Sequence, residues 1–504
     1  MWPPPKTRRD LGVRWLALAF VSTAMFGSYY AYDNASALKE ELQDALNMND
    51  KQFNLLYTVY SIPNMALPLF GGYIVDHMGA NRCILMFSCL VTVGQFIFAT
   101  GVEAGNLSVS LAGRAVFGLG GESLCVAQFA AIARWFSGVE LALAMALSTT
   151  MTRLGTVMND FVSPAIYKLH VPPFMTGAPP APALWFGFWV CLLSSACSAL
   201  LLALDVGVGR RLRAANGPPR SRRGGPSLDA GGSLLGGAEV THAEDEDESG
   251  DKMALKDIRL LGRRFFLLAA TCALTYASIY PFNNIAGGLL QDKYGMDLKK
   301  ADFIMALPYV ISAVLSPCFG SLVDRYGRRS ALMVSASSLI ASAHILFALT
   351  DVAPFLPLSL LGLGFSGFGA VVWPSVALVV AQKAHGTAYG LTTATQNTLM
   401  ALVPLLAGQL KDSAEARDPA GLRHDRHYAG VEVLFAALAA AAVVAGARLM
   451  MVDRRKGGVL RRVASTVIRP GDLSGDPISV SQANVAFDIA DVRAGAGDLY
   501  DTDS

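Results

Sequence analysis

The chain has 504 residues, of which 53% are apolar and 16% are charged, and its formal net charge is +2. A soluble protein of this length carries roughly 25% charged residues, because it must solvate a large surface. The low charge therefore argues against an ordinary soluble protein, and without a basic face we expect no nucleic-acid partner. We expect the chain to be embedded in a lipid bilayer.

Long apolar segments with few charges follow one another along the chain, and each is long enough to cross a bilayer as a helix. They lie at residues 11–33, 54–76, 82–101, 107–132, 140–166, 183–205, 263–288, 301–325, 330–350, 354–381, 387–411 and 429–452. Unpaired backbone amides are not tolerated in lipid, so these segments must be helices rather than open strands. The sequence predicts an all-α membrane protein with twelve transmembrane helices.

A polar interval at residues 206–262 divides the spans into two groups of six. It is rich in Gly, Pro, Ser and Arg and then turns acidic, which is typical of a disordered linker. Basic residues of the short loops fall on one side of the spans, which places both termini in the cytoplasm. We therefore expect a cytoplasmic N-terminus at 1–10, a six-helix bundle at 11–205, a disordered cytoplasmic linker at 206–262, a second six-helix bundle at 263–452 and a disordered cytoplasmic tail at 453–504.

One loop motif occurs twice, after the second span of each group. The first copy reads Gly72-Tyr-Ile-Val-Asp76-His-Met-Gly79 and is followed by Arg82, and the second reads Gly320-Ser-Leu-Val-Asp324-Arg-Tyr-Gly327-Arg328-Arg329. The first glycine permits close helix approach, the aspartate can cap a helix end and pair with arginine, and the later glycine permits a tight turn. We expect the aspartates and arginines of both copies to form a charge clamp that gates the protein.

Two copies of this motif at matching positions resemble the major facilitator superfamily over almost the whole chain. The resemblance implies two pseudo-symmetric six-helix bundles related by an axis along the membrane normal, with a central site and alternating access. The segments Phe26–Asn34, Phe117–Ser123, Tyr280–Phe282, Trp373–Pro374 and Gly386–Gly390 are similar to the lysosomal dipeptide uniporter branch, of the major facilitator superfamily domain-containing protein 1 type. That branch implies dipeptide export from lysosomes and a heavily glycosylated single-span accessory subunit.

Two charged residues fall near the middle of predicted spans, where charge is costly and usually functional. Glu122 lies about 15 residues into the fourth span and Arg153 about 14 into the fifth, so both fall near mid-bilayer at about 1.5 Å per residue. We expect Arg153 to bind a substrate carboxylate and Glu122 to bind its ammonium group, which suits a dipeptide. The alternative is that the two side chains pair with each other and lock the helices together.

The opposite wall of a central site must come from the second group of spans. Tyr280 on the seventh span, Trp373 on the tenth and Asn397 on the eleventh are the expected contributors. Aromatic and amide side chains can hold a peptide group without demanding one particular substrate side chain. Helix packing is the alternative role for these residues.

Four further residues are considered for structural roles. Arg114 is expected to support helix packing and His344 to be a lone packing histidine, and for Tyr29 and Tyr30 the interfacial aromatic belt is the alternative to a place in the site. All seven cysteines fall inside or at the edge of apolar segments, so we expect neither a disulfide nor a metal site. No HExxH or GxSxG motif is present, and we expect neither an enzyme nor a cofactor.

These features together predict a secondary transporter that moves dipeptides by alternating access. The Glu-x-x-Glu-Arg signature of proton-coupled oligopeptide transporters is missing from the first span, which favours uniport. Because a fold does not dictate its substrate, two alternatives stay open. They are a proton-linked carrier of sugars or organic anions, and a non-transporting nutrient sensor.

The resemblance implies a lysosomal or vacuolar membrane, with the plasma membrane as the alternative because the N-terminus lacks an acidic dileucine signal. The non-cytoplasmic loops carry only the glycosylation sequons Asn34-Ala-Ser36 and Asn106-Leu-Ser108, both close against a span. We expect neither to be used. A chain without glycans of its own would be exposed to proteases in the lumen. This fits the glycosylated accessory subunit that the resemblance implies.

Overall fold

The computed structural model describes residues 12–136, 140–168, 181–216, 258, 261–417 and 427–462. Within these ranges the regular elements are helices without strands, which confirms the all-α prediction. The outermost residues of both termini and residues 217–257 of the expected linker lie outside the described ranges. The expected disorder of the linker and tail therefore stays a prediction.

The N-terminal half begins with a helix and includes one crossing that is divided into shorter pieces. Its elements are α1 (Arg14–Ala37), α2 (Lys39–Leu46), α3 (Asp50–Ser61), η2 (Pro63–Met65), α4 (Leu67–Met78), α5 (Ala80–Glu103), α6 (Leu107–Trp135), α7 (Leu141–Lys168) and α8 (Ala181–Asn216). Local sequence sets several of their ends. Asn49 and Gln52 form a reciprocal capping box at α3, and Asn106 caps α6 by accepting from the Val109 amide at 3.2 Å.

The C-terminal half repeats this order. Its elements are α9 (Gly262–Tyr294), α10 (Leu298–Met305), α11 (Leu307–Tyr326), α12 (Arg329–Leu349), α13 (Phe355–Val379), η5 (Gln382–Ala384), α14 (His385–Ala416) and α15 (Ala429–Arg455). Gly79 and Gly327 end α4 and α11 with φ angles of +89° and +68°, which glycine adopts without a Cβ clash. The tight turn expected after each motif aspartate is confirmed.

Each predicted span coincides with one helix or with a broken pair of helices. The second span is divided into α3 and α4, and the eighth into α10 and α11. A proline stands in the first turn of both later helices, Pro68 in α4 and Pro308 in α11, where its missing N–H removes no helical hydrogen bond. The break at the same place in both halves reflects the internal repeat.

Two domain boundaries differ from the predicted ones. Helix α8 continues to Asn216, beyond the expected start of the linker at residue 206, and described backbone continues to Arg462 after α15. At about 1.5 Å per residue, the 36 residues of α8 extend well past the thickness of a bilayer. The apolar run used to predict this span ends before the helix does, because helical turns beyond the bilayer do not need apolar side chains.

Among the described residues, nine helices are long and apolar enough to cross a membrane. The other crossings are α1, the α3–α4 pair and α14. Helices α1 and α14 both contribute polar side chains to a central cavity, including Ser28 of α1 and Thr393, Gln396 and Asn397 of α14. The polar side chains that face the cavity therefore lower the mean hydropathy of α1 and α14 below that of the nine apolar helices.

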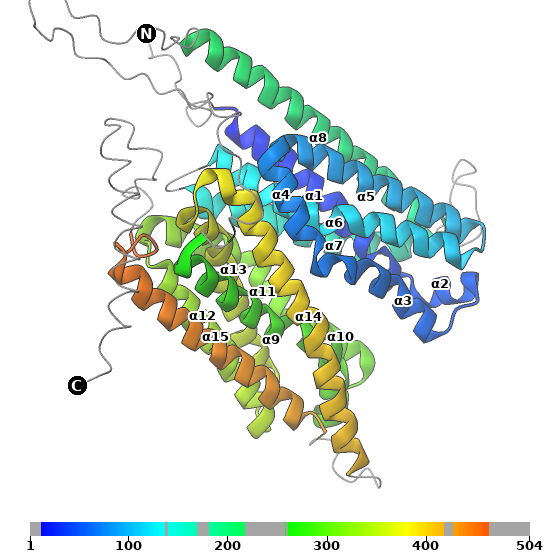
Figure 1. The fold of residues 1–504 in the computed structure, drawn as a ribbon. Coiled ribbons are helices and arrows are strands. Elements are labelled where there is room, and N and C mark those ends of the chain that lie inside the picture. The colour runs from blue at the N-terminus through cyan, green and yellow to red at the C-terminus, as the bar shows by residue number, and fades with distance from the viewer. Residues whose placement is uncertain are drawn as a thin grey trace, which may run out of the picture.

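The two halves lie side by side in Figure 1, with α1–α8 in blue to blue-green and α9–α15 in green to orange. They meet chiefly where α4 packs on α14 and where α7 packs on α11. We call the face on which α1 begins and α15 ends the terminal side, and the opposite face the far side. Helices α3 and α10, at the far side, pack mainly within their own halves.

Candidate functional site

The first motif aspartate joins the two halves at the terminal side. Asp76 Oδ1 accepts from the backbone amide of Gly386 at 2.7 Å, and its Oδ2 accepts from the amide and hydroxyl of Thr387 at 2.7 and 2.6 Å. Those amides belong to the first turn of α14, where backbone N–H groups have no acceptor within the helix. A Cβ on Gly72 would overlap the Gly386 carbonyl, so the predicted close approach at this glycine is confirmed.

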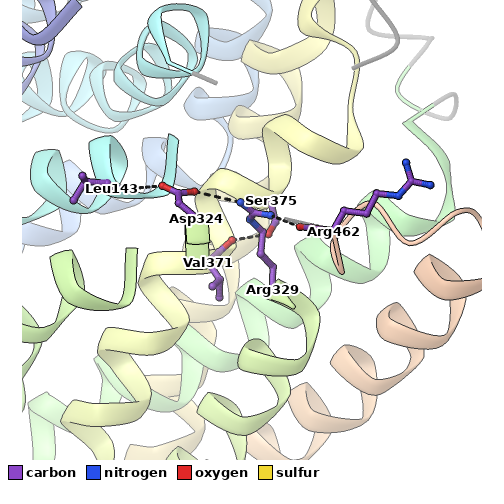
Figure 2. A network of polar contacts seen from close by, with 6 residues as sticks. All are labelled: Leu143, Asp324, Arg329, Val371, Ser375 and Arg462. Atoms are coloured by element: carbon purple, nitrogen blue, oxygen red, sulfur yellow. Dashed lines mark hydrogen bonds and ion pairs between the residues drawn. The ribbon is translucent and has the colours of Figure 1, made fainter. Parts of the chain in front are cut away.

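The second motif aspartate, in the C-terminal half, contacts the start of a helix in the N-terminal half. Asp324 Oδ2 accepts from the backbone amide of Leu143, in the first turn of α7, at 2.9 Å. Its Oδ1 lies 3.3 Å from the Arg329 guanidinium, and both side chains are almost fully buried. Figure 2 shows Asp324 between Leu143 of one half and Arg329 of its own half. A Cβ on Gly320 would come within 2.9 Å of the Ala142 carbonyl, so the helices approach closely here too.

Two of the arginines expected in the charge clamp do not take part in it. Arg82 is exposed and forms no ion pair with Asp76 in the described structure, because the three donors of α14 already occupy that carboxylate. Arg328 is also exposed, in a left-handed conformation with φ of +55°, and only Arg329 reaches Asp324. The clamp is therefore mainly a pair of helix caps rather than two aspartate–arginine pairs.

A cavity of about 270 Å³ lies between the halves. All five residues predicted to contact substrate line it: Glu122, Arg153, Tyr280, Trp373 and Asn397. Its other lining residues are mainly aromatic, small or amide side chains from α1, α3, α6, α7, α9, α11, α13 and α14. The cavity contains one carboxylate and one guanidinium among its lining residues, so its formal charges cancel.

The acid of the cavity is held by neutral groups. The Tyr60 hydroxyl donates to Glu122 Oε1 at 3.2 Å, and the side-chain amide of Asn397 lies close enough to interact with this carboxylate. Tyr60 comes from α3 and Asn397 from α14, so the acid touches both halves. Asn397 also donates to the backbone carbonyl of Asn64 at 3.0 Å, again across the halves.

The base of the cavity is likewise held by neutral groups. Arg153 of α7 donates to the Ser312 hydroxyl and, at 3.4 Å, to the Ser316 hydroxyl, both on α11 of the other half. Its guanidinium lies 4.5 Å from the centre of the Phe365 ring, within the range of a cation–π contact. Glu122 and Arg153 form no ion pair in the described structure, so the alternative in which they lock each other is wrong for this state.

Trp373 forms part of an aromatic cluster at the edge of the cavity. Its ring stacks on Phe129 of α6 with centroids 4.6 Å apart and planes inclined by 16°. Tyr389 of α14 lies 5.6 Å from the same phenylalanine and donates its hydroxyl to the Trp373 carbonyl at 3.1 Å. Trp373 is only 8% exposed, so most of its ring packs against other residues, among them Phe129 of the opposite half.

The sequence profile of the Major Facilitator Superfamily matches residues 18–404 and residues 265–481, so it includes both halves. The chain belongs to the major facilitator superfamily. It is 31% identical to the human lysosomal dipeptide transporter MFSD1 over 454 residues, which are 89% of this chain and 88% of that relative. The zebrafish (Danio rerio) protein of the same name is 32% identical over 457 residues, or 90% of each chain.

Solved structures support the fold of this major facilitator chain. A bacterial homologue of the iron transporter ferroportin, in its outward-facing state, is similar with a TM-score of 0.63 at 13% sequence identity. The match covers 87% of this chain and 99% of that chain. At so low an identity the likeness concerns the fold alone.

Several cavity residues of this major facilitator protein were not predicted from the sequence. Tyr29 lines the cavity and Tyr30 is buried, so the alternative that placed them in an interfacial belt was wrong. Tyr60 and Phe129 were not singled out, although they contact Glu122 and Trp373. In a helix that is apolar on every side, the sequence does not distinguish a face toward lipid from a face toward a cavity.

Two predicted packing residues lie outside the cavity. Arg114 is fully buried among five aromatic rings and donates to the Tyr32 carbonyl at 3.2 Å, which supports the packing interpretation. His344 is not a lone histidine, because its Nδ1 lies 2.8 Å from Glu432 Oε2 and both side chains are fully buried. The partner was missed because it lies 88 positions away, on α15.

Proposed function

We propose that this protein transports dipeptides by alternating access, as a uniporter of the lysosomal or vacuolar membrane. The observation that carries the proposal is that Glu122 and Arg153 line one cavity without neutralising each other. Relatives that share about nine-tenths of the chain are named lysosomal dipeptide transporters, which supports the same substrate class.

A zwitterion with separated ends suits this cavity. Arg153 offers a planar pair of donors to a carboxylate, and Glu122 offers acceptors to an ammonium group. Each currently bonds neutral groups, which a charged substrate group would replace with a stronger, charge-assisted partner. Sugars lack both charges, and organic anions lack the ammonium group.

The substrate's side chains would meet mainly aromatic and small residues. Tyr276, Tyr280 and Phe365 form edge-to-face and tilted contacts with one another along one wall. Such rings bury apolar or aromatic side chains by contact rather than by a specific hydrogen bond. A transporter of many dipeptides needs a wall of this kind.

Binding would also couple to the change of state. Glu122 contacts Asn397 of the other half, and Arg153 contacts Ser312 of the other half. A substrate that takes over these two charges therefore changes contacts between the halves, which is what alternating access requires. The terminal side is closed by the two aspartate caps, so the cavity is assigned to the far side in this state.

The terminal side is assigned to the cytoplasm, because the basic loop residues gather there. The far side would then be the lumen. Asn34 is fully buried and donates to Asn159 at 2.8 Å, and Asn106 caps α6, so neither sequon is well placed for a glycan. A glycosylated single-span accessory subunit would shield the lumenal face of a chain that carries no glycans itself.

Transport by purified protein in proteoliposomes tests this function. We expect saturable uptake of labelled dipeptides, weak uptake of single amino acids and no uptake of sugars. An imposed pH gradient should not drive dipeptide accumulation. Proton-driven uptake of sugars or organic anions would contradict the proposal, and flux of no solute at all would favour the sensor.

A further inference from the structure

The chain turns back on itself directly after α15. Gly457 and Gly458 have φ angles of +95° and +65°, and the Gly458 amide donates to the Asp453 carbonyl at 2.7 Å. Only glycine adopts two successive left-handed conformations at little cost. The reversal directs residues 457–462, which we call the strap, toward the loop between α11 and α12.

The strap is anchored in the C-terminal half by a buried leucine and a buried acid. Leu460 is fully buried, and its amide donates to Asp453 Oδ2 at 3.1 Å. Asp453 is itself 1% exposed and lies 3.6 Å from the Arg264 guanidinium of α9. The same guanidinium lies 3.4 Å from the Lys456 carbonyl. These contacts hold the strap in one place rather than leaving it loose on the surface.

The backbone of the strap forms hydrogen bonds with the backbone of the loop between α11 and α12. The Arg329 amide donates to the Leu460 carbonyl at 2.8 Å, and the Arg328 amide donates to the Arg461 carbonyl at 3.2 Å. A Cβ on Gly327 would lie within 2.7 Å of the Arg461 carbonyl, so the loop approaches the strap as closely as glycine allows.

The strap also contacts the side chain that holds the gate aspartate. Arg329 Nη1 lies 3.4 Å from the Arg462 carbonyl, while its Nη2 lies 3.3 Å from Asp324 Oδ1 (Figure 2). Arg329 is 1% exposed, and a buried guanidinium needs acceptors for its donors. The strap therefore supplies one of the two acceptors that keep this arginine inside the protein.

We propose that the strap is a positioning element of the gate. It holds Arg329 against Asp324, so that Asp324 can cap α7 of the opposite half while the terminal side is closed. The two halves differ in this respect, because Asp76 accepts three hydrogen bonds from Gly386 and Thr387 and, among the described residues, no segment pairs with its loop as the strap pairs with residues 328 and 329. The inference rests on alternating access by this fold and does not depend on the dipeptide assignment.

Hydrogen–deuterium exchange of the full-length protein in lipid nanodiscs tests the strap. Leu460→Asp places a charge at a buried site, and a chain ended after Lys456 removes the strap together with the tail that follows it. In both variants we expect the first turn of α7, residues 141–145, to exchange about tenfold faster, as expected for loss of a charge-assisted hydrogen bond.

Two control variants separate positioning from general loosening. Arg462→Ala keeps the backbone carbonyl that the gate uses, and the Arg462 side chain is exposed. Leu449→Ala removes volume from a fully buried site on α15 and leaves residues 457–462 unchanged in sequence. Both should keep wild-type exchange at residues 141–145. Faster exchange that stays confined to the strap and to residues 327–331, with residues 141–145 unchanged, would overturn the proposal.

Discussion

The Asp76 carboxylate accepts both the backbone amide and the hydroxyl of Thr387, at 2.7 and 2.6 Å, although the two residues belong to opposite halves. Asp324 makes the reciprocal contact with the Leu143 amide. Each half thus caps the first turn of a helix in the other half, where free amides and the helix dipole favour an anion. If these caps gate the protein as proposed, they must separate when the terminal side opens, which the following variants test.

Replacing Asp76 by Asn should loosen the gate. The amide keeps one acceptor but loses the negative charge at the α14 terminus, which we expect to cost about 1–2 kcal/mol. The cavity should then open to the terminal side about tenfold more often. The measurement is the labelling rate of Cys125, which lines the cavity, by an impermeant maleimide in a chain whose other cysteines are replaced.

Asp44→Asn is the matched control for this experiment. Asp44 is exposed on α2, at the far side, and its side chain has no described contact with the gate. It should label at the wild-type rate. Equal labelling of Asp76→Asn and wild type would show that the cap does not hold the gate closed.

Arg153→Ala should abolish dipeptide flux while the protein still reaches the membrane. Arg153→Lys should restore only part of it, because an ammonium group lacks the planar fork and stacks less well on Phe365. The informative measurement compares a free dipeptide with its C-terminal amide in a competition assay. Amidation should weaken binding at least about tenfold in wild type and have little further effect in Arg153→Ala. An equal penalty in both proteins would remove Arg153 from the carboxylate site.

Phe129 and Trp373 should stabilise the closed state together. Their stacked rings join the halves, and such a pair contributes about 0.5–1.5 kcal/mol beyond the area it buries. A double-mutant cycle of Phe129→Leu and Trp373→Leu, read out by Cys125 labelling from the terminal side, should therefore give a coupling energy of about 1 kcal/mol. Strict additivity of the two variants would indicate that the rings pack independently.

The buried pair of His344 and Glu432 should matter for stability rather than transport. Glu432→Ala leaves a fully buried histidine without its 2.8 Å partner, and breaking a buried pair in this way costs about 3 kcal/mol. We expect a lower unfolding temperature in detergent and wild-type flux per folded molecule. Glu140→Ala, which breaks the part-exposed pair with Arg14, should cost about 0–1 kcal/mol. A loss of flux in Glu432→Ala at unchanged stability would instead place the pair in the transport cycle.

Much of the architecture could be predicted because lipid imposes simple demands on a sequence. The lengths of the apolar runs predicted the crossings, and the repeated glycines around Asp76 and Asp324 predicted close helix contact and a tight turn at the right places. The depth of Glu122 and Arg153 along their helices was enough to place both in one cavity. These are local properties, counted along one helix.

Partners across helices could not be predicted in the same way. Asp76 contacts the start of α14 rather than Arg82, His344 contacts Glu432, and Phe129 contacts Trp373. Each pair joins residues far apart in the chain. The rotation of each apolar helix about its own axis decides which residues face each other. That rotation depends on packing against neighbours.

The sequence by itself determined that this protein crosses a membrane with two repeated helical halves and carries one acid and one base near their centre. Only the tertiary structure decided that these charges stay apart, each held by neutral groups that include partners from the opposite half. It also decided that Asp76 and Asp324 cap helices of the opposite halves, and that the strap contacts the arginine beside Asp324. The physical reason is that burial and helix length follow from composition, whereas the choice of polar partner follows from which faces meet in space.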